Sequence, residues 1–266
     1  QQGQIDKAIE VYQKALEHNP NDYGIYNNLG VTYANQGQMD QALEYYQKAL
    51  ELEPHRPDAY FNLGNWYHQQ QELEKAQETF QQTIRLAPEH VMGHLNLGNV
   101  LRELDKIYPA IAHYQKVLEL QPTHFQAWNN LGSVYKDQSK LDSAIECFQK
   151  ALNIKPDYLR AKHNLADLLR DRGQIAEAVA LYEAILKQRP EDDDAYLKLG
   201  VIYYQEGWLQ KAIDYCKKTV EYNPKAYLAY NNLGAAIKAK GQIEEAMTYY
   251  RKSIEIKPDF WGAWTN

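Results

Sequence analysis

Hydrophobic residues in this chain recur with helical spacing in stretches that follow one another along its length. In one stretch Tyr26, Leu29, Gly30 and Tyr33 are spaced i, i+3, i+4 and i+7. This spacing is typical of one face of an amphipathic helix. A second stripe with the same kind of spacing follows over residues 39–50. The pattern therefore predicts pairs of amphipathic helices.

These predicted pairs repeat with a fixed period. Eight of the ten prolines are spaced 34 residues apart: Pro20, Pro54, Pro88, Pro122, Pro156, Pro190, Pro224 and Pro258. Alanines and leucines form two further series with the same step, which begin at Ala8 and Leu29. No insertion or deletion breaks the register. A fixed period of this length indicates an array of stacked helical repeats.

The repeat positions are numbered here so that the recurring proline is position 32 and Tyr23 is position 1. Small residues at positions 8 and 20 predict that the two helices of a pair cross closely, since glycine inside a helix costs about 1 kcal/mol relative to alanine. The proline ends the second helix. Glycine recurs at position 15, where a left-handed helix cap favours it: Gly3, Gly37, Gly173, Gly207 and Gly241.

The period predicts a single array over residues 1–266. It consists of a partial repeat (1–22), full repeats and a truncated repeat (261–266), the full repeats being 23–56, 57–90, 91–124, 125–158, 159–192, 193–226 and 227–260. Natural arrays end in a helix with a polar outer face, and none is visible here. We therefore expect a piece of a longer array, with uncapped ends that include Trp261 and Trp264.

The charge balance changes the choice of partners. A net charge of -6 argues against nucleic acid, whose phosphates need a clustered positive field, and against a polybasic membrane-binding surface. No apolar run reaches the length of a membrane span.

Cys147 and Cys216 form no CxxC pair, so we expect two buried, unreactive thiols on second helices. Free thiols favour a reducing compartment, and we expect a cytoplasmic location.

Catalytic chemistry is not indicated by any motif in the chain. No phosphate-binding loop, dinucleotide fingerprint, HExxH or GxSxG stretch occurs. His90 and His94 are four residues apart, but His94 occupies a packing position and no third ligand is evident. We predict no metal, no cofactor and no catalytic residue, and a chain that is not itself an enzyme.

A set of residues within one repeat resembles the tetratricopeptide repeat signature, which has the same period: Trp128, Leu131, Gly132, Tyr135, Ala144, Phe148 and Pro156. The resemblance covers the whole chain. It implies an all-α fold, an α-solenoid of antiparallel helix pairs stacked into a right-handed superhelix. It also implies that positions 2, 5, 6, 9, 12 and 13 of each first helix face a concave groove. Lys162 at position 4, Lys198 at position 6 and Cys216 at position 24 depart from the pattern.

Asparagine fills position 6 in seven of eight repeats, although it is a poor residue inside a helix: Asn28, Asn62, Asn96, Asn130, Asn164, Asn232 and Asn266. A carboxamide both donates and accepts, so it can pair with a peptide backbone of any sequence. This series is similar to the asparagine ladder of O-GlcNAc transferase arrays, and Asn65 and Asn99 at position 9 would face the same groove. The alternative is that these amides serve local hydrogen bonding.

Positively charged residues at position 12, among them Arg102, Lys136 and Arg170, are followed by acidic residues at position 13. One interpretation is a mixed-charge wall that favours acidic partner segments, and the other is weak pairing between neighbouring repeats. We expect the binding centre at residues 57–170. Aromatic residues on the same helices are candidates for side-chain pockets, or for core in the case of Trp66: Phe61, Trp66 and Tyr204.

These patterns predict a protein-interaction scaffold that binds an extended segment of a partner protein in its concave groove. A second hypothesis is the substrate-presenting array of a larger enzyme, such as a glycosyltransferase resembling O-GlcNAc transferase, with catalysis outside these residues. A third is self-assembly, in which the uncapped ends stack end to end.

Overall fold

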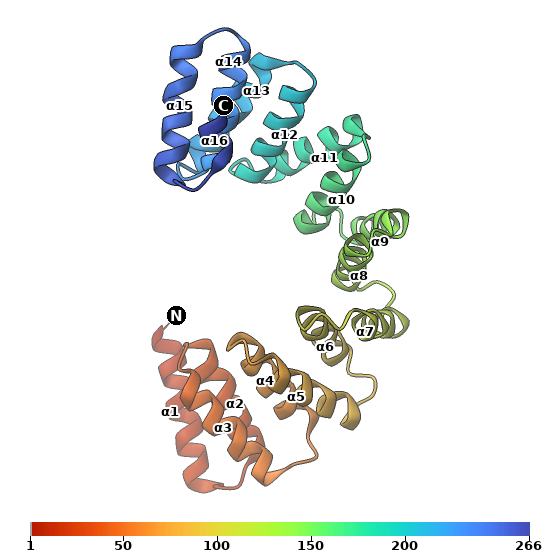
Figure 1. Cartoon of the computed structure of the whole chain (residues 1–266). Coiled ribbons are helices and arrows are strands. Elements are labelled where there is room, and N and C mark those ends of the chain that lie inside the picture. The colour runs from red at the N-terminus through yellow and green to blue at the C-terminus, as the bar shows by residue number, and fades with distance from the viewer. Residues whose placement is uncertain (1) are drawn as a thin grey trace. The chain divides into compact units, whose positions relative to one another are not determined.

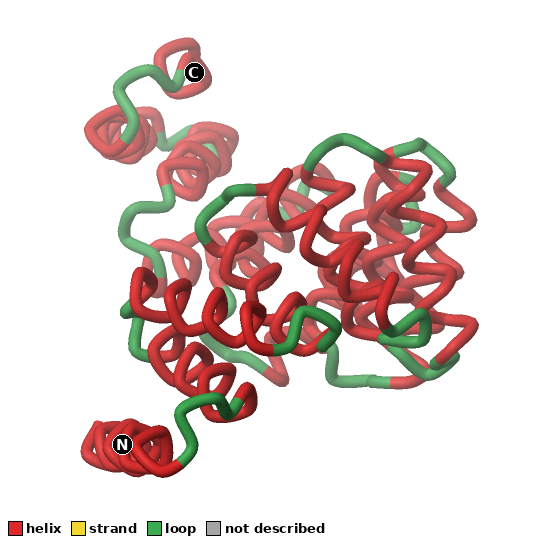
Figure 2. Tube along the Cα trace, turned by 90° about the horizontal axis from the view of Figure 1, so that it is seen from below, coloured by secondary structure: helices red, strands yellow, loops and turns green. Residues whose placement is uncertain are grey.

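The computed structural model describes residues 2–266 and contains only helices and connecting loops in that range (Figures 1 and 2). Its sixteen helices are α1 (Gln2–His18), α2 (Tyr23–Asn35), α3 (Met39–Leu52), α4 (Pro57–Gln69), α5 (Leu73–Leu86), α6 (Val91–Glu103), α7 (Ile107–Leu120), α8 (Phe125–Asp137), α9 (Leu141–Ile154), α10 (Leu159–Asp171), α11 (Ile175–Gln188), α12 (Asp193–Gln205), α13 (Leu209–Tyr222), α14 (Tyr227–Ala239), α15 (Ile243–Ile256) and α16 (Trp261–Thr265). The all-α prediction is confirmed.

The chain forms two compact units, Gln1–Gln138 and Ser139–Asn266. In the first unit α2 packs on α3, α4 on α5 and α6 on α7, and each pair also contacts the helix that follows it. In the second unit the pairs are α10 with α11, α12 with α13 and α14 with α15. Each unit is therefore an α-solenoid of stacked helix pairs, and the handedness of the superhelix stays a prediction.

The close crossing within a pair depends on position 8. A Cβ atom added to Gly98 would lie 2.8 Å from the ring of Tyr114, and one added to Gly200 would lie 2.5 Å from the Cys216 sulfur. Tyr114 and Cys216 both occupy position 24 and are fully or almost fully buried. The prediction of a close crossing is confirmed, and the residue at position 24 is the one that packs over the glycine.

The first helices end in a left-handed residue at position 15, as predicted. The φ angle is 75° at Gly37 and 77° at Gly173, a conformation that glycine adopts without a steric penalty. Two further repeats hold Gln71 at 61° and Asp105 at 58° in the same conformation. Gly3 differs from the expectation because it lies inside α1.

Position 4 anchors the chain where one repeat follows another. In four repeats its side chain donates to the carbonyl of the preceding recurring proline: Tyr26 Oη to Pro20 (3.1 Å), His94 Nε2 to Pro88 (2.9 Å), Trp128 Nε1 to Pro122 (2.9 Å) and Trp264 Nε1 to Pro258 (2.9 Å). Lys162 cannot reproduce this aromatic anchor. Its ammonium donates instead to Gln188 Oε1 at 2.7 Å.

Candidate functional site

Six of the asparagines at position 6 lie on first helices and Asn266 directly follows α16, and all seven are partly or fully exposed. Those of the first unit are Asn28 on α2, Asn62 on α4, Asn96 on α6 and Asn130 on α8. In the second unit Asn164 lies on α10 and Asn232 on α14. Each unit thus carries its own series of carboxamides on its first helices.

Neighbouring repeats are joined by hydrogen bonds between these carboxamides. Asn96 Nδ2 donates to Asn65 Oδ1 at 2.7 Å, and Asn130 Nδ2 donates to Asn99 Oδ1 at 2.9 Å. In both cases position 6 donates to position 9 of the preceding repeat. Local hydrogen bonding is therefore part of what these asparagines do, and it ties one first helix to the next.

Where position 9 is apolar, the acceptor moves to position 5. Val31 occupies position 9 of the first full repeat, and there Asn62 Nδ2 donates to Asn27 Oδ1 at 2.9 Å. Asn266 Nδ2 donates in the same way to Asn231 Oδ1 at 3.0 Å. Sequence reasoning missed Asn27 and Asn231, although the exchange of asparagine between positions 5 and 9 was visible in the aligned repeats.

Asn232 lies outside this scheme. The preceding repeat has Leu197 and Val201 at positions 5 and 9, neither of which can accept a hydrogen bond from it. Its own Oδ1 accepts from the neighbouring Asn231 Nδ2 at 3.5 Å. The donor of Asn232 is therefore not used between repeats.

Lys198 stands at position 6 in place of asparagine, and it forms an ion pair with position 9 of the preceding repeat where the asparagines form a hydrogen bond. Its Nζ lies 3.4 Å from Asp167 Oδ1, and Asp167 occupies position 9. Tyr182 Oη donates to the same carboxylate at 2.6 Å, and Arg170 Nη1 lies 3.4 Å from it. Burial would raise the pKa of Asp167, but the hydrogen bond from Tyr182 and the two cations outweigh it and hold this pKa below its usual value.

The paired carboxamides keep most of their hydrogen-bonding capacity. In the Asn96–Asn65 pair, one N–H of Asn96 and the oxygen of Asn65 are used. The oxygen of Asn96 stays available as an acceptor, and the two amide hydrogens of Asn65 stay available as donors. In the next pair, Asn99 Oδ1 accepts a second hydrogen bond from Tyr114 Oη at 2.9 Å, which fixes its amide orientation. Stacking and ligand binding can therefore use different atoms of the same asparagines.

Some charged residues at position 12 pair with neighbouring acidic residues, and others have no ion-pair partner in the described part of the chain and could face a bound segment. His68 Nε2 lies 2.9 Å from Glu103 Oε1 at position 13 of the next repeat, which is pairing between neighbours. Arg170 lies 2.7 Å from Asp171 on its own helix. Arg102 on α6 and Lys136 on α8 form no ion pair with the residues that the structure describes. The first unit thus leaves two cations on adjacent first helices without an acidic partner.

The histidines His90 and His94 and the two cysteines make contacts that stabilise the fold. His90 Nδ1 accepts from Gly93 N at 2.8 Å and caps α6, and His94 contacts His113. Residues 2–266 bring no three His, Cys, Asp or Glu side chains together in a way that could hold a metal ion. Both thiols are buried as expected, and burial raises the pKa of Cys147 to about 11 and that of Cys216 to about 12.

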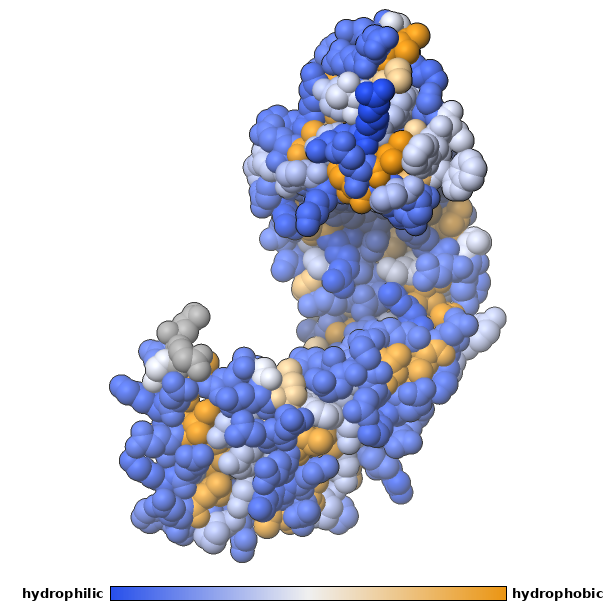
Figure 3. All heavy atoms as spheres, turned by 60° about the vertical axis from the view of Figure 1, so that its left-hand side comes forward, coloured by the Kyte–Doolittle hydropathy of each residue, from blue (hydrophilic) through white to orange (hydrophobic). Residues whose placement is uncertain are grey.

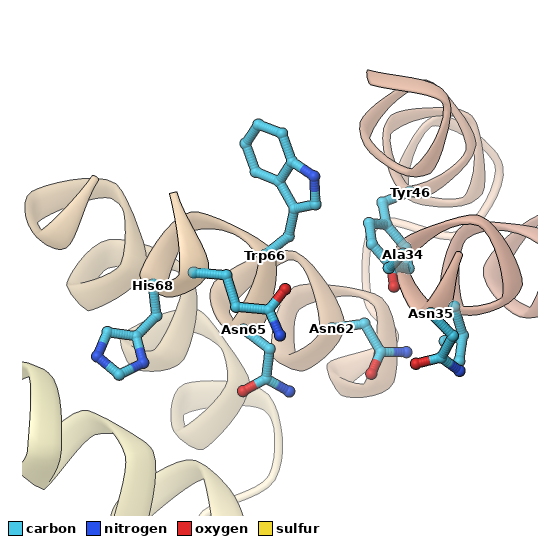
Figure 4. Close-up of a pocket in the computed structure, with 9 residues that line it drawn as sticks. Ala34, Asn35, Tyr46, Asn62, Asn65, Trp66 and His68 are labelled. Carbon is cyan, nitrogen blue, oxygen red and sulfur yellow. The ribbon is translucent and has the colours of Figure 1, made fainter. Parts of the chain in front are cut away.

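An open pocket of about 260 Å³ lies between α2 and α4 in the first unit (Figure 4). It is lined by Val31, Ala34, Asn35, Tyr46, Asn62, Asn65, Trp66, His68 and Gln69. Trp66 is 7% exposed and donates from Nε1 to Met39 O at 2.8 Å, so it is a core residue that also borders the pocket.

The visible surface around both units is mostly hydrophilic (Figure 3). Within the described residues, no helix combines the length and the apolar character that crossing a membrane requires.

Comparison with protein families agrees with the repeat pattern. Tetratricopeptide repeat models match residues 22–89, 93–124 and 227–260, and a TPR repeat model matches residues 1–37. The TPR domain of cytochrome c-type biogenesis protein H matches residues 114–229. The chain belongs to the tetratricopeptide repeat family. None of the curated proteins compared with it matches.

Solved structures with the same fold include other tetratricopeptide proteins. The crystal structure of YrrB is described as that of a TPR protein with an unusual peptide-binding site. Its sequence is 26% identical to this chain, the match covers 71% of this chain and 98% of YrrB, and the TM-score is 0.60. MamA is 28% identical over 61% of this chain and 95% of its own, with a TM-score of 0.57. Pseudomonas aeruginosa PilF, 21% identical over 85% of this chain and 96% of its own (TM-score 0.68), is similar in fold alone.

Proposed function

We propose that this chain is a non-catalytic scaffold whose first helices bind an extended segment of a partner protein. The observation that carries the proposal is the carboxamide pairing on consecutive first helices of the first unit. The pairs are Asn62–Asn27, Asn96–Asn65 and Asn130–Asn99. Arg102 and Lys136, without acidic partners on the same helices, favour a segment with acidic side chains.

The chemistry of an extended segment matches these pairs. Each of its residues carries one N–H donor and one C=O acceptor, which need partners when they leave water. A position 6 asparagine offers the acceptor, and its partner at position 5 or 9 offers the donor. Each hydrogen bond contributes about 1 kcal/mol net, so several repeats are needed for useful affinity. YrrB, which is 26% identical and described as having a peptide-binding site, supports the same proposal.

The proposal is tested on peptides selected from a random phage-displayed library with the wild-type chain as bait. The dissociation constant of a selected peptide is then measured for Asn96→Ala/Asn130→Ala. Loss of two paired carboxamides should weaken binding by about 10- to 100-fold. Gln77→Ala is the matched control, because it removes an inter-repeat hydrogen bond from Lys106 Nζ (2.7 Å) that lies outside the first helices. An unchanged affinity in the asparagine variant would contradict the proposal.

A second candidate function is self-association through the end of the second unit. Trp261 is 79% exposed and Trp264 is 64% exposed. Trp264 also borders an open pocket of about 460 Å³ together with Ile243 and Met247, which are both exposed. Exposed apolar clusters of this kind are typical of interaction surfaces.

The third candidate is a substrate-presenting array that belongs to a larger enzyme resembling O-GlcNAc transferase. The same carboxamide pairs would then hold the substrate protein, and catalysis would lie outside residues 1–266. Sequencing the gene on both sides of this region separates the two functions. A cytoplasmic location and the absence of a nucleic-acid partner, which rests on the net charge of -6, stay predictions.

A further inference from the structure

The pocket between α2 and α4 exists because the first full repeat lacks a large side chain at position 12. Ala34 occupies this position. The later repeats place a longer side chain there: His68, Arg102, Lys136, Arg170, Tyr204 and Lys238. The same repeat has the apolar Val31 at position 9, where the next two repeats have asparagine. The space is therefore a specific departure from the repeat pattern.

A tyrosine hydroxyl without a protein partner borders this space. Tyr46 on α3 is 3% exposed and lines the pocket, and Figure 4 shows its ring pointing from α3 toward the gap between α2 and α4. Burial raises its pKa to about 12. Its hydroxyl makes no hydrogen bond to the described residues.

Two other tyrosines at position 24 have partners at position 9. Tyr114 Oη donates to Asn99 at 2.9 Å, and Tyr182 Oη donates to Asp167 at 2.6 Å. Val31, which stands at position 9 beside Tyr46, has no polar atom in its side chain. A ligand that enters the pocket takes this hydroxyl out of water. It gains affinity if it supplies a hydrogen-bond partner and loses affinity if it leaves the hydroxyl unpaired.

The lining of the pocket selects against charge. It contains no Lys, Arg, Asp or Glu, and His68 already contacts Glu103 at 2.9 Å. A charged side chain would lose water here without gaining a counter-charge. Val31, Ala34 and Trp66 offer apolar and aromatic surface for the body of a side chain.

We propose that this pocket is a subsite for an uncharged, hydroxyl-tipped aromatic side chain, a tyrosine of the partner segment, which hydrogen bonds to the Tyr46 hydroxyl. Its role as a subsite rests on the proposed function, because Asn62 and Asn27 would hold the backbone beside it. Phenylalanine would leave the hydroxyl unpaired. A carboxamide would pair with it but would bury less apolar surface.

The pocket is tested with p-cresol, which is the tyrosine side chain alone. Toluene and propionamide serve as the phenylalanine and carboxamide analogues. Binding to the full ¹⁵N-labelled chain is followed by the NMR signal of the Trp66 indole N–H. We expect p-cresol to bind about fivefold more tightly than toluene, which is the effect of one hydrogen bond. None of these probes contains a peptide backbone, so the result is independent of the asparagine pairs.

Two variants decide whether binding occurs in this pocket. Ala34→Arg places at position 12 the residue that two other repeats have there, and it should abolish p-cresol binding. Tyr46→Phe should keep binding but remove the preference for p-cresol over toluene. Ala112→Arg adds the same side chain at an exposed alanine on α7 and should change nothing.

The proposal is overturned if no probe binds, if toluene or propionamide binds as tightly as p-cresol, or if Ala34→Arg binds p-cresol like the wild type. The circular dichroism of Ala34→Arg shows whether it is folded, and Tyr46→Phe tests the claim independently. If p-cresol binds as predicted but selected peptides ignore the Asn96→Ala/Asn130→Ala change, the pocket stands and the proposed function fails.

Discussion

At the scale of single residues, Tyr46 and Tyr114 at position 24 pack in the same way, but their hydroxyls have different polar surroundings. Tyr46 and Tyr114 both lie over a glycine of the first helix, Gly30 and Gly98. Only Tyr114 has a partner for its hydroxyl, the amide oxygen of Asn99. The ring therefore packs where the two helices cross, and the residue at position 9 decides whether the hydroxyl has a hydrogen-bond partner.

This difference predicts opposite results for the same substitution. Tyr114→Phe should lower the free energy of unfolding by about 1 kcal/mol, because it removes a hydrogen bond and leaves part of Asn99 unpaired. Tyr46→Phe should be neutral or stabilising, because it removes a hydroxyl that has no partner. Urea denaturation followed by circular dichroism measures both. Equal losses in the two variants would contradict the assignment.

The sequence predicted which face carries the asparagines, but it could not show which of their atoms are used. The bond from Asn96 to Asn65 depends on the distance between stacked first helices, which a periodic pattern does not contain. The pocket at Ala34 was missed for a related reason. A missing side chain leaves a space only where its neighbours do not close it, and that is a property of packing.

At the scale of helices, the turn between the two helices of a pair requires a left-handed residue at position 15. The five glycines there predicted the cap, and four of them adopt it. Gln71, Asp105 and Ser139 show that the fold imposes the same conformation on residues with a Cβ atom. The cap is therefore fixed by the crossing of the helices and only assisted by glycine.

Gln71→Gly should raise the melting temperature, because glycine removes the steric cost of the left-handed conformation. The expected gain is about 0.5 to 1 kcal/mol after the entropy of the unfolded chain is subtracted. The reverse change, Gly173→Gln, should destabilise the chain by a similar amount. Differential scanning calorimetry of both variants checks the sign, and a loss in Gln71→Gly would contradict it.

The pair formed by α6 and α7 contains a proton-sensitive contact. His94 Nε2 donates to Pro88 O, so its Nδ1 is the acceptor for the Nδ1–H of His113 at 2.9 Å. Burial, and secondarily the neighbouring His94, lower the pKa of His113 to about 4. Folding therefore favours neutral His113.

This contact should make stability depend on pH between about 6.5 and 4. Above this range His113 is neutral in both states. Within it the unfolded chain takes up a proton that the folded chain does not, so stability falls as the pH falls. As the pH falls through this range, the free energy of unfolding of the His113→Gln variant should decrease by about 1 to 3 kcal/mol less than that of the wild type. Urea denaturation at several pH values measures the difference, with His55→Gln, at an exposed loop histidine, as the control.

At the scale of the whole molecule, the repeat period predicted an array of stacked helix pairs, since identical helix pairs can bury their apolar faces only against one another. The resemblance to the tetratricopeptide family added the solenoid. The period does not predict that the chain divides into two compact units at Gln138 and Ser139. The division falls between α8 and α9, which are the two helices of one repeat. The sequence already indicated Trp261 and Trp264 at an uncapped end, and the structure adds the exposed Ile243 and Met247 of α15 beside Trp264.

Self-association through this end predicts that the mass in solution rises with protein concentration. Trp261→Ser/Trp264→Ser should abolish the rise, because it removes the two most exposed tryptophans of the chain. Sedimentation velocity over a range of concentrations measures it. A constant monomer mass for the wild type would rule out this candidate function.

The most direct test of the central claim is to observe the carboxamides while a partner segment binds. A selected peptide is titrated into the full ¹⁵N-labelled chain, and the side-chain NH₂ signals of Asn62, Asn96 and Asn130 are followed by NMR. Binding along the first helices predicts that these signals shift together and saturate at the dissociation constant measured by other means. Saturable binding that leaves all of them unmoved, while signals at Trp261 and Trp264 shift, would contradict it.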